Sequence, residues 1–125
     1  MIVLDSSAVL AWLQDEPGAE RVDDILGESA ISSVNWSEVL QKTLPYKPDT
    51  QATTAQFTAL GVQIIPFDGA QAEQAALLYS HTQSAGLSLG DRACLALAQT
   101  LKCPVLTADR AWQTITLDLT IETLR

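Results

Sequence analysis

Four acidic residues stand beside apolar segments of the chain, in positions that would suit a site for a divalent cation. Each one directly follows a predicted β-strand or lies in a helix next to one, and they are Asp5, Glu38, Asp91 and Asp109. In open α/β sheets, ligands bind beyond the carboxyl ends of the strands. All four side chains can therefore reach one edge of the predicted sheet, although they are far apart in the sequence.

The chemistry open to such a group follows from its charge. Three or four carboxylates without a basic partner repel one another strongly when they are partly buried, so they either take up protons or hold a cation. Mg²⁺ and Mn²⁺ are hard ions that prefer carboxylate oxygens. Such an ion activates water and stabilises the charge of a phosphorane-like transition state, which favours hydrolysis of a phosphate ester.

Each acid also has a purely structural explanation. Asp5 and the two serines after it can cap a helix, and Asn35 with Glu38 fits an Asn-x-x-Glu capping box. Ser88 and Asp91 form a helix start signal of the same kind. The joint placement of the four acids, and not any one of them, predicts a site.

Several other classes of enzyme lack their motifs here. The sequence contains no G-x-S-x-G, no G-x-x-x-x-G-K-S/T and no G-x-G-x-x-G after the first strand. His81 is the only histidine, which gives a serine or cysteine triad little support, and it is predicted to lie on the surface. Zinc would need clustered histidine and cysteine ligands, which the chain does not offer.

The stretch from Gly86 to Trp112 carries the clearest structural signals. Residues 88–101 are apolar on nearly all sides, which predicts a buried helix. Lys102-Cys103-Pro104 ends this helix, because proline cannot continue it. Val105–Thr107 is a short apolar strand, so that Asp109 falls just past its end.

Strands and helices alternate through the rest of the chain. Further strands are predicted at residues 2–4, 29–32, 62–67 and 117–121. Helices are predicted at residues 8–13, 19–26, from 34 onward, from 49 or 50 to about 60 and from 70 to about 85, with a helical turn at 111–114. This alternation predicts one α/β domain over residues 1–125, with three layers (α/β/α) and a mainly parallel sheet of about five strands.

Composition bounds the class of protein. Apolar residues make up 47% and charged residues 18%, which is typical of a globular domain. No apolar run approaches the roughly 20 residues of a membrane span, and no basic leader precedes the first strand. Cys94 and Cys103 form no metal-binding pattern and are interpreted as buried thiols in a reducing compartment. A cytoplasmic location without membrane contact is therefore expected.

The formal net charge is −8, which by itself argues against a nucleic-acid partner. The charge is unevenly distributed, because the segment from Asp15 to Glu28 contains six acidic residues and only one basic residue, Arg21. Apart from that helix and the four candidate site residues, the remaining charges nearly balance. A bound cation would offset the negative charge of the site itself.

Four segments in a fixed order also carry a family resemblance. They are I-V-L-D-S-S-A-V-L-A-W-L from Ile2, S-V-N-W-S-E-V from Ser33, V-Q-I-I-P-F-D from Val62, and L-S-L-G-D-R-A-C-L-A-L-A with C-P-V-L-T-A-D-R-A-W from Leu87. Together they cover nearly the whole chain and resemble the PIN domain family. Within that family, the chain is similar to the VapC-type toxin ribonucleases of prokaryotic toxin–antitoxin pairs.

The resemblance implies a sheet in the order 3-2-1-4-5 and an endoribonuclease that depends on Mg²⁺ or Mn²⁺. It implies that the metal-site acids are Asp5, Glu38, Asp91 and Asp109. It also implies that Ser6 and Thr107 orient those acids or the water. A homodimer and a cognate antitoxin, which inserts a segment into the cleft, are expected as well.

Two further expectations concern RNA and the alternatives to catalysis. The basic residues that could contact RNA phosphates near the site are Lys42, Lys47, Arg92 and Arg110, although solvated or helix-end cations are an equally good interpretation. The acidity of the chain keeps open a catalytically weak scaffold that binds protein or RNA. A metal-dependent phosphohydrolase acting on another substrate is a third possibility.

Overall fold

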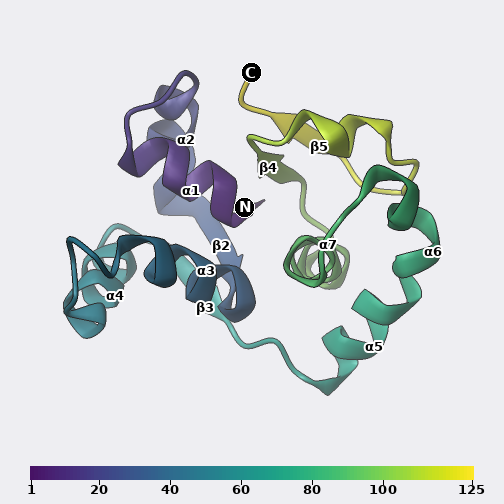
Figure 1. The fold of residues 1–125 in the computed structure, drawn as a ribbon, viewed down its shortest axis with the longest axis horizontal. Coiled ribbons are helices and arrows are strands. Elements are labelled where there is room, and N and C mark those ends of the chain that lie inside the picture. The colour runs from purple at the N-terminus through teal and green to yellow at the C-terminus, as the bar shows by residue number, and fades with distance from the viewer.

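The structure, a computed structural model, describes all residues 1–125 and has a five-stranded parallel sheet with helices on both faces (Figure 1). The strands are β1 (Ile2–Leu4), β2 (Ser29–Ser32), β3 (Gln63–Ile65), β4 (Val105–Thr107) and β5 (Ile121–Thr123). They lie in the order β3-β2-β1-β4-β5, and every neighbouring pair is parallel. The predicted fold class and strand order are confirmed.

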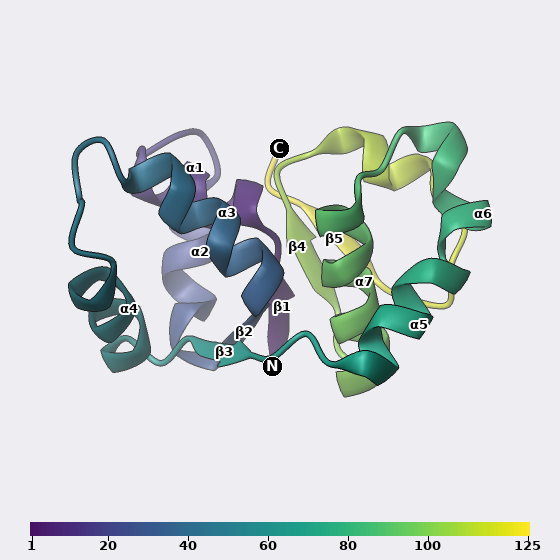
Figure 2. The ribbon, with the colours of Figure 1, turned by 60° about the horizontal axis from the view of Figure 1, so that its bottom comes forward.

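The helices cover the sheet between these strands. They are α1 (Ser6–Leu13), α2 (Ala19–Ile25), α3 (Ser33–Thr43), α4 (Thr50–Ala59), α5 (Gly69–Leu77), α6 (Tyr79–Thr82) and α7 (Leu89–Leu101), with 3-10 turns η1 (Leu26–Glu28), η2 (Gln83–Ala85) and η3 (Arg110–Thr114). Figure 2 shows α4 at one end of the molecule and α6 at the other, with β1 and β4 between them. None of the helices has the length and apolar character needed to span a membrane.

Two apolar cores lie on opposite faces of the sheet, because successive strand residues point to opposite sides. Leu4 and Leu106 pack with Val9 and Ile31 in the core beneath α1–α4. Val3 and Val105 pack instead in the core formed with α5 and α7. Residues Ala93–Ala98 of α7 are fully buried there, so that the nearly all-apolar helix predicted from the sequence is confirmed.

The register of β1 against β4 positions the candidate site. Val3 pairs with Val105 and Leu4 with Leu106. The next residues are Asp5, directly after β1, and Thr107, the last residue of β4, which therefore come side by side at the carboxyl edge of the sheet.

The sequence-predicted helix over residues 70–85 is wrong as a single element. The structure divides it into α5, α6 and η2, and its buried stripe is Gln71, Ala75 and Leu78. The helical spacing of Ala72, Ala75, Ala76 and Tyr79 predicts that these residues share one face, but only Ala75 is buried and the other three are exposed. The 3.6-residue period is the same for both stripes, so alanine spacing alone could not identify the face that packs on α7.

Several boundaries also differ from the expectation. The strand predicted at 62–67 is reduced to β3, because Pro66 has no N–H and Phe67 donates its N–H to the Ser33 hydroxyl. The last strand is β5 at Ile121–Thr123 and not residues 117–121. The first helix begins at Ser6, two residues earlier than predicted.

Candidate active site

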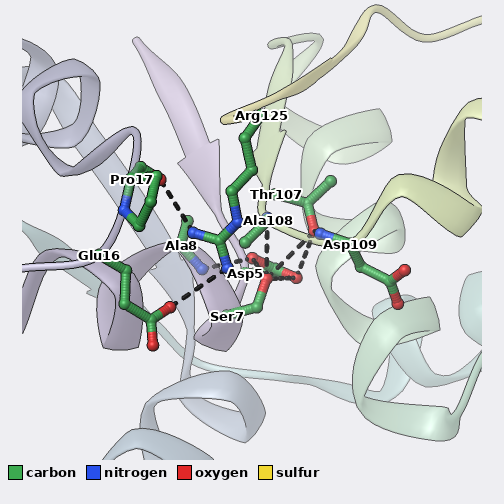
Figure 3. Close-up of polar contacts among 9 residues, drawn as sticks. All are labelled: Asp5, Ser7, Ala8, Glu16, Pro17, Thr107, Ala108, Asp109 and Arg125. Carbon is green, nitrogen blue, oxygen red and sulfur yellow. Dashed lines mark hydrogen bonds and ion pairs between the residues drawn. The ribbon is translucent and has the colours of Figure 1, made fainter. Parts of the chain in front are cut away.

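Asp5 is the most buried of the four candidate acids and lies at the carboxyl end of β1. It caps α1, since its Oδ1 accepts a 2.9 Å hydrogen bond from the Ala8 N–H. Its Oδ2 accepts a 2.7 Å hydrogen bond from the Thr107 hydroxyl (Figure 3). Burial raises the pKa of Asp5 to about 6, although the hydrogen bonds from Thr107, Ala8 and Ser7 oppose this rise. The capping explanation and the functional one therefore apply to the same residue.

Ser7 is a site residue that was not expected from the sequence. Its hydroxyl lies 2.8 Å from both carboxylate oxygens of Asp5 and accepts a 2.9 Å hydrogen bond from the Ala108 N–H. The same hydroxyl lies 3.2 Å from that of Thr107. Ser7 thus connects the first turn of α1 to the turn after β4, a long-range contact for which two consecutive serines after an aspartate are the only sequence signal.

Glu38 reaches the same edge from the first turns of α3. Its Oε1 accepts hydrogen bonds from the Ser6 hydroxyl at 3.2 Å and from Nδ2 of Asn35 at 2.9 Å. The predicted Asn35–Glu38 capping box is wrong, because Ser32 caps α3 and Asn35 already lies inside the helix. Asn35 is instead a buried bridge whose Nδ2 also donates to the Gly90 carbonyl at 2.9 Å.

Asp91 occupies the first turn of α7. It forms the predicted capping box with Ser88, with hydrogen bonds of 2.9 Å and 3.2 Å between side chains and backbone. Burial raises the pKa of Asp91, and the nearby negative charges of Glu38 and Asp109 raise it further. Asp91 in turn contributes to the raised pKa of Asp5. Asp91 therefore lies close enough to the other three acids to interact with each of them electrostatically.

Cys94 lies directly beneath this group, one turn along α7. The thiol is fully buried, and burial together with the charges of Asp5, Asp91 and Glu38 raises its pKa well above the ordinary value. Such a thiol stays protonated and unreactive. Its predicted role as a buried structural thiol is confirmed, whereas Cys103 is only partly buried.

Asp109 is the most exposed of the four acids. Its N–H donates to the Thr107 hydroxyl at 3.1 Å, and its Oδ1 caps η3 by accepting from the Ala111 N–H at 2.9 Å. Its carboxylate points away from that of Asp5 (Figure 3). Thr107 therefore contacts both acids, because its hydroxyl donates to the Asp5 carboxylate and accepts from the backbone N–H of Asp109.

No group of three or more aspartate, glutamate, histidine or cysteine side chains is arranged so that it alone holds a metal ion. The donors are nevertheless all oxygens, and neither ion pair of the structure neutralises any of the four acids. Mg²⁺ keeps several of its waters and is commonly bound through only one or two carboxylates plus substrate phosphates. The donor set fits a partly hydrated ion of this type, with some acids acting through water.

The predicted RNA-contacting cations are placed very differently. Lys42 and Arg110 line a cavity of about 530 Å³ that Ser7 and Asp109 also line. Lys47 is exposed in the connection between α3 and α4. Arg92 is directed toward α5 and α6, where it donates to the Ala75 carbonyl at 2.9 Å and stacks on Tyr79.

Cavity size alone would not have identified this region. A larger cavity, of about 730 Å³, is lined by Pro104 and Thr120 at the other end of β4. None of the four acids lines it. His81, the only histidine, is exposed and remote from the acids in α6, as expected.

A parallel sheet in this order, with acids gathered at its carboxyl edge, defines a class of α/β proteins that includes the PIN domains. Residues 2–116 match the PIN domain family, and the chain belongs to it. Among curated relatives, it is 26% identical over 121 residues to a protein named Ribonuclease VapC from Mycolicibacterium smegmatis, covering 90% of this chain and 94% of the relative.

Solved structures agree with the fold. A toxin–antitoxin complex from Klebsiella pneumoniae includes a chain with a TM-score of 0.79 and 21% identity, covering 100% of this chain and 98% of that one. A chain of the DNA-bound VapBC from Salmonella typhimurium gives a TM-score of 0.75 at 16% identity, with 99% and 98% covered. These likenesses show that the same architecture extends over the full length of both chains.

Proposed function

We propose that this protein is an endoribonuclease that depends on a divalent cation, Mg²⁺ or Mn²⁺, and acts as the toxin of a toxin–antitoxin pair. The observation that carries the proposal is the group of four carboxylates, none of them neutralised by a basic side chain, at the carboxyl edge of the sheet. Membership of the PIN family and the similarity to a protein named as a ribonuclease support it. Residues 1–125 form a single PIN domain in this proposal.

The roles of the residues follow from their contacts. Asp5, Asp91 and Asp109 hold the ion, directly or through its waters, and Glu38 either holds it or positions the attacking water. When bound, the ion would supply positive charge that lowers the pKa of a water molecule and offsets the negative charge that develops on the phosphoryl oxygens. Thr107 and Ser7 fix the orientation of the Asp5 carboxylate, while Ser6 and Asn35 fix that of Glu38. The expected role of Ser6 and Thr107 as orienting residues is part of this proposal.

A cognate antitoxin and a homodimer are the partners that we propose. Several structural neighbours are described as toxin–antitoxin or VapBC complexes. The chain also carries exposed large apolar side chains outside the acidic site, which are suited to contacts between proteins. They include Leu44 and Tyr46 after α3, and Leu77, Tyr79 and Leu89 around α5–α7. Light scattering after size-exclusion chromatography tests the dimer.

The central test is RNA cleavage by Asp5→Asn in the presence of Mg²⁺ or Mn²⁺. Asparagine caps helices as well as aspartate does, so the fold is expected to survive while cleavage disappears. Asp49→Asn is a matched control, because exposed Asp49 caps α4 in the same way, with its Oδ1 accepting a hydrogen bond from the N–H three residues later. If Asp5→Asn cleaves RNA as fast as the parent, the proposed roles are wrong.

Two observations favour a second candidate, a PIN scaffold that binds protein or RNA with little turnover. They are the formal charge of −8 and the absence of a closed three-residue metal site. Calorimetric titration with Mn²⁺ separates the two, since a scaffold without catalysis does not require the ion. A nucleotide-phosphatase assay run beside the RNA assay tests a phosphohydrolase acting on small phosphates.

A further inference from the structure

The cavity beside Asp109 gathers positive charge in a protein that is otherwise strongly acidic. Its cationic lining residues are Lys42 from α3, Arg110 from η3 and Arg125, which follows β5. Glu16 and Asp109 are the only acids among the residues that line it. The side chains that line the cavity therefore carry a formal net charge of +1, whereas the side chains of the whole sequence carry −8.

Three of the seven lysine and arginine residues of the chain thus converge on one cavity. Two of the others are engaged elsewhere. Arg21 pairs with Glu122 at 3.0 Å, and Arg92 contacts α5. The concentration of cations is a property of the folded chain, because Lys42 comes from a segment far from the other two in the sequence.

The floor of the cavity is continuous with the acidic site. Ser7 lines the cavity, and its hydroxyl donates to the carboxylate of Asp5 at 2.8 Å. Ala108, which also lines it, donates its N–H to the same hydroxyl at 2.9 Å. An anion bound in the cavity would therefore lie next to the carboxylates that are proposed to act on a phosphodiester.

Arg125 is held in place before any ligand arrives. Its guanidinium donates to the Pro17 carbonyl at 2.8 Å and to Oε1 of Glu16 at 3.2 Å (Figure 3). Its own carbonyl accepts a 2.9 Å hydrogen bond from Nε of Arg110. These contacts hold the side chains of Arg110 and Arg125 in fixed positions, so that less conformational entropy is lost when they bind an anion.

Donors remain free in this arrangement. Arg110 uses only its Nε, so that both of its terminal nitrogens lack protein partners. Lys42 forms no ion pair and no side-chain hydrogen bond. Arginine and lysine donors of this kind match the oxygens of a phosphate, and a cavity of about 530 Å³ has the size of common small-molecule sites.

We propose that Lys42, Arg110 and Arg125 form a subsite for an RNA backbone phosphate adjacent to the one that is cleaved. The identification of the ligand as RNA rests on the proposed ribonuclease function. Arg125 is the residue that this subsite adds to the cations expected from the sequence, while Lys47 and Arg92 lie outside it. The subsite also explains how an acidic protein attracts an anionic chain, because the favourable charge is confined to the path beside the acids.

The test is a binding measurement that does not require cleavage. Fluorescence anisotropy of a short fluorescein-labelled oligouridylate is measured in EDTA, so that no metal is present and the RNA stays intact. Lys42→Ala, Arg110→Ala and Arg125→Ala are each expected to weaken binding about tenfold, the usual effect of removing a charge-assisted hydrogen bond. The slope of log affinity against log salt should fall by about 0.7 for each phosphate that a variant no longer binds.

Matched controls exist for two of the variants. Lys102→Ala removes an exposed lysine at the far end of α7 and controls for Lys42→Ala. Arg21→Ala breaks an exposed ion pair and controls for Arg125→Ala, which breaks the one with Glu16. Both controls should bind RNA like the parent. Lys42→Ala is the variant least able to disturb the fold, because Lys42 has no side-chain partner to lose.

The outcomes separate this proposal from the proposed function. Equal losses of affinity in the pocket variants and the controls, or no loss in any of them, would overturn the subsite. A fluorescein-labelled oligoglutamate that binds as tightly as the RNA, and depends on the same three residues, would identify a site for an acidic protein segment and would also overturn it. RNA binding that depends on the three cations, in a protein that cleaves no RNA, would leave the subsite standing and reject the nuclease.

Discussion

The hydroxyl of Thr107, at the end of β4, donates a 2.7 Å hydrogen bond to Oδ2 of Asp5, at the end of β1. The two residues are 102 positions apart in the chain and meet because β1 and β4 are adjacent and in register. The same hydroxyl accepts the N–H of Asp109 at 3.1 Å. One buried side chain thus connects two of the four candidate acids.

Thr107→Val tests this connection, because it keeps the shape of the side chain and removes the hydroxyl. The hydrogen bond from Thr107 lowers the pKa of Asp5, so its loss is expected to move that pKa further above about 6. The free energy of unfolding should fall by about 1–3 kcal/mol, the cost of leaving buried partners unpaired. NMR titration of the Asp5 carboxyl carbon and urea unfolding measure the two effects.

Thr82→Val is the control for this experiment. Thr82 is also buried and donates a 2.9 Å hydrogen bond, in its case to the Leu78 carbonyl, far from the acids. It should lower stability by a similar amount and leave the pKa of Asp5 unchanged. An unchanged Asp5 titration in Thr107→Val would show that the hydroxyl does not control this carboxylate.

The raised pKa of Asp5 predicts how the stability of the metal-free protein depends on pH. Because the folded value of about 6 lies above the ordinary 3.8, the native state binds this proton more tightly than the unfolded chain. The contribution of Asp5 to the free energy of unfolding is therefore greatest below about pH 4 and falls as the pH rises to about 6. A shift of about two units corresponds to about 3 kcal/mol.

Asp5→Asn removes this titration, so its stability relative to the parent should depend on pH. In EDTA we expect the variant to gain stability against the parent, by up to about 3 kcal/mol, between about pH 4 and pH 7. The Thr107 and Ser7 hydroxyls can rotate to accept from the new amide. Urea unfolding at both pH values measures the difference, with Asp49→Asn as the exposed control. A difference from the parent that is the same at both pH values would contradict the burial of a charged Asp5.

The features that were predicted correctly from the sequence are local ones. The capping box of Ser88 and Asp91, the apolar residues of α7 and the three-residue strand β4 all depend on neighbours within a few positions. The family resemblance predicts the order of the sheet, and the place of Asp5 after the first strand predicts its position at the carboxyl edge. Such local patterns predict the structure correctly because they are set by helix and strand geometry.

The features that the sequence does not predict depend on packing between distant segments. The contacts of Ser7 cannot be predicted from its neighbours in the sequence, because its partners, Thr107 and Ala108, are about a hundred positions away. The spacing of Asn35 and Glu38 fits a capping box as one of two explanations, whereas the Asn35 amide in fact donates to the Gly90 carbonyl of α7. Arg92 shares the first turns of α7 with Asp91 but points to the other side of that helix, toward Ala75. Side-chain direction of this kind is decided by tertiary contacts.

The bridge made by Asn35 gives a prediction about charge. Its Nδ2 donates to Oε1 of Glu38 and to the Gly90 carbonyl, and its Oδ1 is buried without a protein partner. Asn35→Asp would replace the Nδ2 donor with a carboxylate oxygen, which would then lie against two other acceptors, Oε1 of Glu38 and the Gly90 carbonyl. The protein should lose about 3 kcal/mol or more at neutral pH and recover part of it at low pH, where the new acid is protonated and can donate again.

Urea unfolding of Asn35→Asp at several pH values measures this loss. Asn35→Ala provides the comparison, because it removes the bridge without adding a charge and should show no recovery at low pH. If Asn35→Asp is as stable as the parent at neutral pH, the amide does not have the donor role that its contacts indicate.

Gly90 gives the prediction that best separates stability from activity. A Cβ at this second residue of α7 would lie 2.8 Å and 2.9 Å from Oε2 and Oε1 of Glu38. The carboxylate is the flexible end of its side chain, so it can move away, but it would leave its contacts with Ser6 and Asn35. Alanine favours the helix by up to about 1 kcal/mol over glycine, which offsets part of the weakened hydrogen bonding.

Gly90→Ala is therefore expected to melt within a few degrees of the parent and to cleave RNA at least about tenfold more slowly, since small misplacements of catalytic groups are costly. Gly69→Ala is the matched control, because Gly69 begins α5 and has no atom within 4 Å of the added carbon. It should leave cleavage unchanged. Thermal melts by circular dichroism measure the stability of both variants, and initial cleavage rates with Mn²⁺ measure their activity. A fully active Gly90→Ala would mean that the observed position of Glu38 is not needed for the reaction.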